Sequence, residues 1–309
     1  MRTIVYHSGA LGDFISILPV LRIWRMHTAS PIDIITRAAH YRLTKHFKIT
    51  GNGIDVDSSV IAKLFVDNGT EIASFISTYT HAILFASESS QIVKNFKSYF
   101  RGALYYHDPH PDRVMHCTDY QLSIIDPVRS MYSSDLSIPS IPFENERNLN
   151  TNRICIHTGS GSALKNWDFN NYLGIAELLR SQGYAICWIR GYAEMSEIYP
   201  SGDCIYTIDS LIDVSMLLND SLLFIGNDSG LSHLAAACGC KVVSIFGPSD
   251  PAVWAPKGTG DIRIIYNRKN CSPCHLQNST VNKECQRECL QSIGIHTVAD
   301  ICMQLVSSM

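Results

Sequence analysis

Three short motifs combine small residues with charged ones, and each follows an apolar run that is typical of a buried strand. In the strongest of them, Asp228, Ser229 and Gly230 stand between such a run and an Ala-rich helical stretch. Hydroxyl and backbone N–H donors at the start of a helix attract anions, so this turn suits a diphosphate. His233 lies one turn further along the same face. It either contributes to this site or packs in the core, and the sequence favours neither.

A second motif, residues 157–167, consists mainly of small residues with a lysine near its end. Ser160 and Gly161 would expose backbone N–H groups and Lys165 adds a cation, which together suit a phosphate site. The motif lacks both the Gly-Lys-Ser/Thr of a Walker A loop and the G-x-S-x-G of a hydrolase elbow. The alternative for Lys165 is an ordinary solvated lysine.

A third motif, residues 7–13, follows the first strand-like run and holds two glycines that allow a tight turn into a helix. Gly9 and Gly12 do not complete a G-x-G-x-x-G, so dinucleotide binding is only weakly supported. Asp13 falls in the first turn of the predicted helix. Its carboxylate is either a helix cap that the dipole stabilises or a general base at the edge of a cleft.

Four cysteines near the C-terminus form two close pairs with the spacing C-x2-C-x10-C-x3-C. They are Cys271, Cys274, Cys285 and Cys289. Such pairs are compatible with a tetrahedral structural zinc site, and unligated thiols or a labile disulfide are the alternatives. The chain has 11 cysteines in 309 residues and no clear export signal, which favours reduced thiols in a cytosol.

Strand-like and helical patterns alternate along the whole chain, which indicates parallel sheets joined by helices. In the first half, strands are predicted over 3–6, 32–36, 81–85 and 103–106, with a helix over 14–26 that Pro19 kinks or delays. In the second half, strands are predicted over 153–158, 184–189, 221–225 and 241–246, and helices over 169–181, 211–218 and 231–238. Residues 137–153 are typical of a linker. We therefore expect two doubly wound α/β domains, 1–145 and 146–309, with ligands at the carboxyl ends of their strands.

The composition is that of a globular protein, with 46% hydrophobic and 17% charged residues and a net charge of −3. Nucleic acid is therefore not an expected partner, and no apolar run is long enough to span a membrane. Between Asp33 and Asp55 there is no acidic residue, while basic residues gather. They are Arg37, His40, Arg42, Lys45, His46 and Lys48. This basic stretch is either a solvated helix face or a surface that meets an anionic acceptor or anionic lipid.

Taken in order, the motifs resemble glycosyltransferase family 9, the lipopolysaccharide heptosyltransferases. The matching residues are Leu11-Gly12-Asp13 with Pro19, Gly159-Ser160-Gly161 with Lys165 and Trp167, residues 226–233, Phe246-Gly247-Pro248, and the Cys-rich tail. The resemblance implies the GT-B fold, with two Rossmann-like doubly wound domains facing a central cleft. It implies an acceptor domain over 1–145 and a nucleotide-sugar domain over 146–309, whose last helix, about 295–309, could pack back on the first domain.

The resemblance also implies roles for individual residues. Asp13 matches the family's general base, with Gly12 and His7 on the acceptor side, although many members have an arginine in place of His7. On the donor side, the matching residues are Ser160, Gly161, Lys165, Asp228, Ser229, Gly230 and His233, with Glu194 at the adenosine end. The implied reaction is an inverting transfer that needs neither metal nor cofactor and moves heptose from ADP-heptose to the inner core of lipopolysaccharide.

The implied acceptor is a lipid-linked glycan, so the resemblance predicts a cytoplasmic enzyme in peripheral contact with the inner membrane. The basic stretch between Arg37 and Lys48 is the predicted contact surface. The alternatives are a transferase of the same fold with another nucleotide-sugar donor, a sugar-nucleotide epimerase or hydrolase, an NAD-dependent oxidoreductase, and a non-catalytic nucleotide-binding module. The retention of both Asp13 and Lys165 argues against the non-catalytic module.

Overall fold

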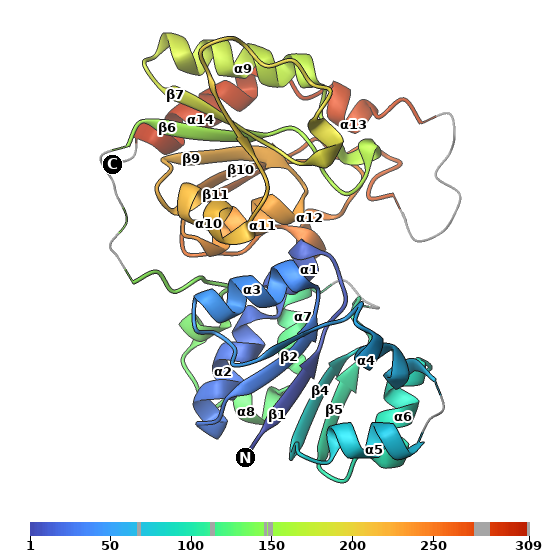
Figure 1. The fold of residues 1–309 in the computed structure, drawn as a ribbon. Coiled ribbons are helices and arrows are strands. Elements are labelled where there is room, and N and C mark those ends of the chain that lie inside the picture. The colour runs from blue at the N-terminus through green and yellow to red at the C-terminus, as the bar shows by residue number, and fades with distance from the viewer. Residues whose placement is uncertain (67–68, 112–114, 145–146, 148–150, 275–284, 308–309) are drawn as a thin grey trace. The chain divides into compact units, whose positions relative to one another are not determined.

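The computed structural model describes the chain except for residues 67–68, 112–114, 145–146, 148–150, 275–284 and 308–309 (Figure 1). The chain divides into two compact units, Met1–Pro139 and Ser140–Met309, which are described separately. The point of division lies within the predicted linker, residues 137–153.

The first unit is built on a five-stranded parallel sheet with the strand order β3-β2-β1-β4-β5. Its strands are β1 (Thr3–Tyr6), β2 (Ile32–Thr36), β3 (Gly53–Asp55), β4 (His81–Phe85) and β5 (Ala103–His107). The central strands β1 and β2 are buried at every residue, because helices cover both faces of the sheet. The four strands predicted in this half of the sequence are all present.

In the first unit, the predicted helix over 14–26 is divided between two helices, α1 and α2. The helices of this unit are α1 (Leu11–Ser16), α2 (Leu18–Thr28), α3 (Ala38–His46), α4 (Ser59–Ala62), α5 (Gly69–Ile76), α6 (Gln91–Tyr99), α7 (Cys117–Ser123) and α8 (Asp126–Arg129), with 3₁₀ turns η1 (Lys63–Phe65) and η2 (Ser134–Ser137). Pro19 occupies the first turn of α2, where its missing N–H costs nothing, so it marks a new start. Phe14, Leu21 and Trp24 of the predicted apolar stripe are buried.

The second unit has a six-stranded parallel sheet with the order β11-β10-β9-β6-β7-β8. Its strands are β6 (Arg153–His157), β7 (Ala185–Arg190), β8 (Cys204–Thr207), β9 (Leu223–Asn227), β10 (Lys241–Phe246) and β11 (Ile262–Tyr266). The four predicted strands of this half are again present. Three strands, β3, β8 and β11, were not predicted from the sequence; each is a partly exposed strand at a sheet edge.

Helices cover both faces of the second sheet, with α9 and α14 on one side and α10 and α11 on the other (Figure 1). The helices and 3₁₀ turns are η3 (Ala163–Lys165), α9 (Phe169–Ser181), η4 (Tyr192–Glu194), α10 (Leu211–Asn219), α11 (Gly230–Ala237), α12 (Pro251–Trp254), α13 (Glu288–Gln291) and α14 (Ile295–Ser307). As predicted, Asp168 caps α9 by accepting from the Asn170 N–H at 2.8 Å. The last helix, α14, buries Val298, Cys302 and Leu305 in the core of its own unit. That it could also pack back on the first domain stays a prediction.

In each sheet, successive strands are added first towards one edge and then towards the other, so the strand order reverses once. The reversal lies between β1 and β4 in the first unit and between β6 and β9 in the second. Ligands of doubly wound proteins bind at such a switch point, outside the carboxyl ends of the strands. The three motifs of the sequence follow β1, β6 and β9, so all of them stand at a switch point.

Candidate functional site

An ion pair joins two motifs at the switch point of the second unit. The Lys165 Nζ lies 2.7 Å from the Asp228 Oδ2, and the two side chains are 25% and 6% exposed. Lys165 comes from the 3₁₀ turn after β6, whereas Asp228 directly follows β9. The burial of Asp228 fixes one end of the pair, so the lysine ammonium is held at this edge of the sheet rather than left to solvent. The structure thus disfavours an ordinary solvated lysine.

Asn227, the last residue of β9, connects these two motifs through hydrogen bonds. Its side chain is fully buried at the end of β9 and donates to the Thr158 carbonyl at 2.7 Å. Its Oδ1 accepts from the Trp167 N–H at 2.9 Å and from the Tyr172 hydroxyl at 2.8 Å. Burial raises the pKa of Tyr172 well above its ordinary value, so this phenol stays protonated and keeps donating. The sequence analysis missed Asn227, although a polar residue at the end of an apolar strand beside a motif could have identified it.

In the loop after β6, Ser160 makes hydrogen bonds within the loop, whereas Gly161 faces open space. The Ser160 hydroxyl lies 2.8 Å from the Ser162 carbonyl and 2.6 Å from the Asn166 Oδ1, both acceptors. Its single proton is therefore used within the loop, and Ser160 shapes the loop instead of offering its hydroxyl to a ligand. A Cβ placed on Gly161 would meet no atom within 4 Å, so this residue faces open space.

Glu194 packs directly on the glycine of the same loop. Its carboxylate accepts from the Gly191 N–H at 2.8 Å, and only 7% of the residue is exposed. A Cβ added to Gly159 would lie 1.9 Å from the Glu194 Oε1, so Glu194 would have to move to admit one. His157 Nε2 is 3.8 Å from Glu194. Burial lowers the pKa of His157 to about 4, so the imidazole is neutral at pH 7 and forms no ion pair.

A second carboxylate, Glu197, stands beside Glu194 and was not singled out from the sequence. Its Oε2 accepts from the Thr158 hydroxyl at 2.7 Å and from the Tyr199 hydroxyl at 2.6 Å. Burial, followed by the hydrogen bond to Glu197, raises the pKa of Tyr199. Glu197 therefore fixes the residue that precedes Gly159 and supports the loop rather than facing a ligand.

The turn after β9 places Ser229 at the N-cap of α11, with Gly230 as the first helical residue. The Ser229 side chain makes no capping hydrogen bond, so it leaves the first N–H groups of the helix to other acceptors. Ser232 donates to the Asn227 carbonyl at 2.5 Å and ties the helix to the strand. His233 is buried in the first turn of α11, and its burial fits a packed core residue as well as a site residue.

In the first unit, Asp13 lies in the first turn of α1, next to Gly12. Its Oδ2 accepts from the Ala10 N–H at 3.2 Å, so the carboxylate does cap the helix. One oxygen serves this bond and the residue is half-buried, which leaves capacity for a further proton or hydrogen bond. The capping interpretation is confirmed, and the role of general base stays a prediction.

His7 lies under the same turn as Asp13. A Cβ on Gly9 would come within 2.9 Å of the His7 ring and 3.1 Å of the Asp13 Cβ. The ring is 1% exposed and packs between Phe14 and Phe85, at centroid distances of 5.6 and 5.8 Å. Neither ring nitrogen has a hydrogen-bond partner among the described residues. Burial lowers the pKa of His7 to about 3, so the ring is neutral at pH 7.

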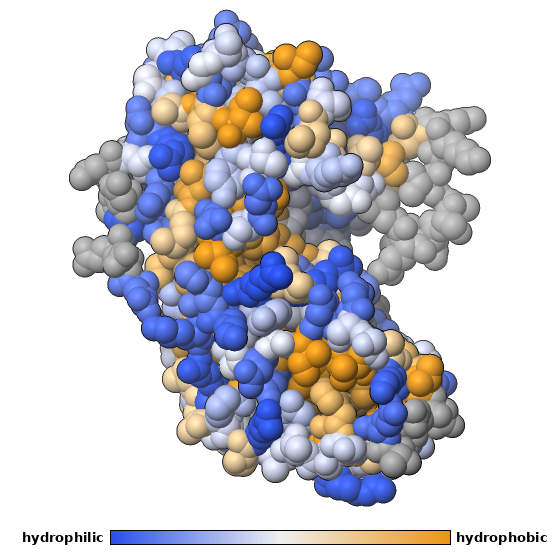
Figure 2. Space-filling model, viewed as in Figure 1, coloured by the Kyte–Doolittle hydropathy of each residue, from blue (hydrophilic) through white to orange (hydrophobic). Residues whose placement is uncertain are grey.

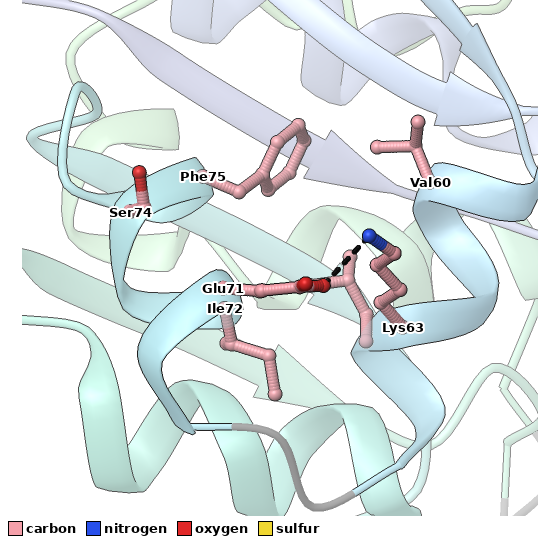
Figure 3. A pocket seen from close by; sticks show the side chains of 7 residues that line it. Val60, Lys63, Glu71, Ile72, Ser74 and Phe75 are labelled. Carbon is pink, nitrogen blue, oxygen red and sulfur yellow. Dashed lines mark ion pairs between the residues drawn. The ribbon is translucent and has the colours of Figure 1, made fainter.

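A different pocket of the first unit lies between the α4–η1 segment and α5 (Figure 3). Lys63 and Glu71 form an ion pair of 2.7 Å across it, and both side chains are about half exposed. Val60 and Phe65 are exposed nearby, in a part of the unit where Figure 2 shows an apolar surface. The pocket contains none of the predicted site residues.

The four tail cysteines all line one small cavity of the second unit. Within the described ranges, no three Cys, His, Asp or Glu side chains are already arranged as metal ligands. The described part of the chain also contains no helix that is long and apolar enough to cross a membrane.

Two known heptosyltransferases are similar to this chain in sequence. Lipooligosaccharide heptosyltransferase 2 of Campylobacter jejuni subsp. jejuni serotype O:2 is 24% identical over 281 residues, covering 78% of this chain and 85% of that protein. Lipopolysaccharide heptosyltransferase 3 of Escherichia coli strain K12 is 25% identical over 121 residues. That second alignment spans a third of this chain and a third of the relative's own length.

Solved structures of similar fold cover the whole chain. The glycosyl transferase family 9 protein from Veillonella parvula DSM 2008 aligns with a TM-score of 0.77 and 17% identity, over 100% of this chain and 97% of that one. The E. coli ADP-heptose lipopolysaccharide heptosyltransferase II aligns with a TM-score of 0.74 and 16% identity, over 99% of each chain. These similarities confirm the predicted GT-B fold with two Rossmann-like domains.

The family model that matches the sequence is described as glycosyltransferase family 9 (heptosyltransferase). It aligns with residues 121–284, which is more than half of the chain and includes the motifs after β6 and β9. The protein with this Lys165–Asp228 pair is a member of glycosyltransferase family 9.

Proposed function

We propose that the protein is an inverting glycosyltransferase that moves heptose from ADP-heptose to the inner core of lipopolysaccharide or a related glycan. One observation carries the proposal: the Lys165–Asp228 ion pair lies beside the N-terminus of α11, at the switch point between β6 and β9. The family is one of heptosyltransferases, and the E. coli neighbour is described as an ADP-heptose enzyme. Both observations support this donor.

The donor side would stabilise the leaving diphosphate. As the bond between the anomeric carbon and the diphosphate oxygen breaks, negative charge grows on the departing ADP. The Lys165 ammonium and the N–H groups at the start of α11 offer positive charge and donors for it. Asp228 is negative and would not contact the diphosphate itself. Its proposed role is to hold Lys165, while Glu194 accepts from the adenosine end, beside Gly159.

The acceptor side would supply a base. In the proposed step the acceptor oxygen attacks the anomeric carbon, its proton passes to the Asp13 carboxylate, and ADP leaves with the bonding electron pair. One displacement inverts the anomeric centre and needs no covalent intermediate on the enzyme. Gly12 would lie near the acceptor, and the buried His7 ring would support the turn that carries Asp13 from below Gly9.

The acceptor is proposed to be lipid-linked, with the enzyme on the cytoplasmic face of the inner membrane. The basic stretch from Arg37 to Lys48 supports a peripheral contact, because α3 exposes Arg42 and Lys45 one turn apart on its surface. Cations in such a stretch attract anionic headgroups.

Nucleotide binding tests the donor assignment. ADP should raise the melting temperature of the purified chain more than UDP, GDP or NAD, because a ligand of the folded state stabilises it. Lys165→Ala should weaken ADP binding by about 10- to 100-fold, as expected for a lost charged hydrogen bond. Lys94→Ala is the matched control, since Lys94 is an exposed lysine of α6 in the first unit.

The same experiment separates the alternatives. Stabilisation by UDP or GDP, with transfer from the corresponding sugar nucleotide, would redirect the donor within the same fold. Stabilisation by NAD alone would contradict the proposal. Transfer of heptose from ADP-heptose to a lipopolysaccharide core lacking it, followed by mass spectrometry, would test the complete reaction.

A further inference from the structure

Three cysteines lie side by side across the second sheet. Cys155 of β6 is the register partner of Cys187 on β7, and Cys187 is in turn the register partner of Cys204 on β8. Register partners on neighbouring strands point to the same face of a sheet, so the three thiols form a row. The row ends at β8, which is an edge strand.

The two sulfur atoms nearest the edge are in direct contact. The Cys187 Sγ lies 3.0 Å from the Cys204 Sγ. A disulfide requires Cα atoms roughly 4.4–6.8 Å apart, and neighbouring strands of a sheet are spaced about 4.7–4.9 Å apart. Two cysteines in register on β7 and β8 therefore meet the requirement without a movement of either strand.

The three thiols differ in their exposure and in their other contacts. Cys155 and Cys187 are fully buried, whereas Cys204 is exposed. A reagent in solvent can therefore reach the row at Cys204. At the buried end, the Cys155 Sγ lies 3.1 Å from the Ser221 hydroxyl, which donates to the Leu217 carbonyl at 2.6 Å. The Cys155 thiol thus has a partner outside the row, and Cys204 is the partner that Cys187 can share with solvent.

We propose that Cys187 and Cys204 are a modification site, at which a low-molecular-weight disulfide such as oxidised glutathione converts the two thiols into a reversible disulfide. The Cys204 thiolate attacks one sulfur of oxidised glutathione and releases the first glutathione thiolate. Cys187 then loses its proton, attacks the Cys204 sulfur and releases the second. Two protons leave the protein, and the two electrons reduce oxidised glutathione to two glutathione molecules.

The surroundings of the pair make this reaction slow at neutral pH. Burial, followed by the hydrogen bond with Cys187, raises the pKa of Cys204 to about 11. The pKa of Cys187 is raised as well, first by a hydrogen bond with Cys155 and then by burial. Because the thiolate is the attacking form, brief contact with an oxidant leaves the pair reduced and prolonged contact oxidises it. Most disulfides of cytosolic proteins are transient in this way.

The disulfide would close a loop that supports the donor side. Residues 188–203 lie between the two cysteines and include Glu194 and Glu197, which contact the loop after β6. Closing a loop of this size restricts the unfolded chain, and the bond ties the edge strand β8 to β7. Oxidation should therefore raise the melting temperature by about 3–10 °C.

Peptide mapping tests the link directly. The full chain is reduced, freed of reductant and incubated with oxidised glutathione at about pH 8.5, where more of each thiol is ionised. Remaining thiols are then alkylated and the chain is cleaved with trypsin. Mass spectrometry should find peptide 181–190, which contains Cys187, joined to peptide 191–241 through Cys204. Dithiothreitol should separate the two peptides.

The thermal effect is assigned to this bond by two matched variants. Cys204→Ser should melt at the same temperature before and after the glutathione treatment, apart from any effect of other thiols. Cys271→Ser removes another exposed thiol of the second unit and should keep the full increase. Equal increases in wild type and Cys204→Ser would contradict a stabilising bond between β7 and β8.

Two mapping results would overturn the proposal. In the first, Cys204 carries glutathione after prolonged treatment while peptide 181–190 remains unlinked, so that Cys187 does not complete the exchange. In the second, peptide 181–190 is joined to peptide 154–165, which would make Cys155 the partner of Cys187. Neither result depends on ADP binding or on sugar transfer.

Discussion

The carboxyl edges of the two sheets carry the predicted site residues but differ in how those residues are held. At the edge of the second sheet, Lys165 is paired with Asp228 at 2.7 Å, and Asn227 ties the neighbouring loops together. At the edge of the first sheet, the Asp13 carboxylate accepts one hydrogen bond of 3.2 Å, and both ring nitrogens of His7 lack partners among the described residues.

This difference bears on the chemistry that each edge could support. Polar groups fixed before a ligand arrives need no reorganisation when charge develops, which suits the departure of a diphosphate. At the edge of the first sheet, the His7 nitrogens make no such fixed contacts among the described residues. The predicted site residues of the second unit are therefore held in a fixed polar network, whereas those of the first unit make fewer polar contacts among the described residues.

The largest expected effect comes from removing the proposed base. Asp13→Asn should lower the rate of transfer by about 10²- to 10⁴-fold, because general-base catalysis typically contributes that much. The amide can still accept from the Ala10 N–H, so helix α1 and ADP affinity should be preserved. Steady-state transfer and ADP titration measure the two quantities.

The matched control for this change is Asp126→Asn. Asp126 is an exposed carboxylate in the first turn of α8, so its loss changes a similar helix dipole interaction. It should leave the transfer rate unchanged. Normal transfer by Asp13→Asn would refute the base assignment and reduce Asp13 to a helix cap.

Lowering the pH should destabilise the first unit more than the second. Burial lowers the pKa of His7 to about 3, and of His40 and His157 to about 4. The unfolded chain takes up these protons near pH 6.5, before the folded chain does, so the free energy of unfolding must fall as pH drops from about 6.5 towards 4. For each histidine, the loss of free energy of unfolding cannot exceed about 1.4 kcal/mol per unit of difference between its pKa values in the unfolded and folded chains. Two of the three histidines, His7 and His40, belong to the first unit.

Urea denaturation of wild type, His7→Gln and His157→Gln at pH 7 and pH 4.5 measures this effect. Removing a histidine should reduce the loss of stability between the two pH values, while carboxylates contribute equally to all three proteins. His46→Gln is the control, because His46 is exposed. An equal pH dependence in wild type and His7→Gln would show that His7 does not carry the effect.

A smaller effect is expected from a methyl group in the loop after β6. Gly159→Ala would place a Cβ 1.9 Å from the Glu194 carboxylate, and overpacking of this kind costs about 1–3 kcal/mol of folding free energy. ADP affinity should fall as well, because Glu194 must move. Gly161→Ala is the control in the same loop, since its Cβ would meet no atom within 4 Å. Equal stabilities of the two variants, measured by denaturant titration, would contradict the close packing.

The buried strands of both sheets could be predicted from the sequence. Strands such as β1 and β10 are mostly apolar because both of their faces are covered, and these apolar stretches predict them directly. The edge strands β3, β8 and β11 are partly exposed and carry no such run, so they were missed. Pro19 was predicted to kink a helix or start it later, and the second outcome is the one found.

The candidate site was predictable where a local motif defines it. The small-residue loop, the Asp228 turn and Asp13 all follow strands directly and could be found from spacing. The contacts that hold them come from residues distant in the sequence, as in the hydrogen bond that the Trp167 N–H donates to Asn227, 60 positions away. The role of Glu197 likewise depends on the way β6 and the chain after η4 meet in the folded unit.

The smallest expected effect concerns the basic stretch of the first unit. Arg42 and Lys45 are exposed one turn apart on α3, and Lys45 also lies in the last turn, where the helix dipole favours a cation. A cation near an anionic bilayer contributes about 1 kcal/mol, so Lys45→Glu should weaken binding to phosphatidylglycerol vesicles by roughly 5-fold or more at low salt. Lys94→Glu, at an exposed position of α6, changes the net charge equally and should have little effect. Because exposed charges are screened, the difference should disappear as salt rises towards 1 M. Equal vesicle binding by both variants in a sedimentation assay would assign the basic stretch to a solvated helix face and contradict a membrane contact at α3.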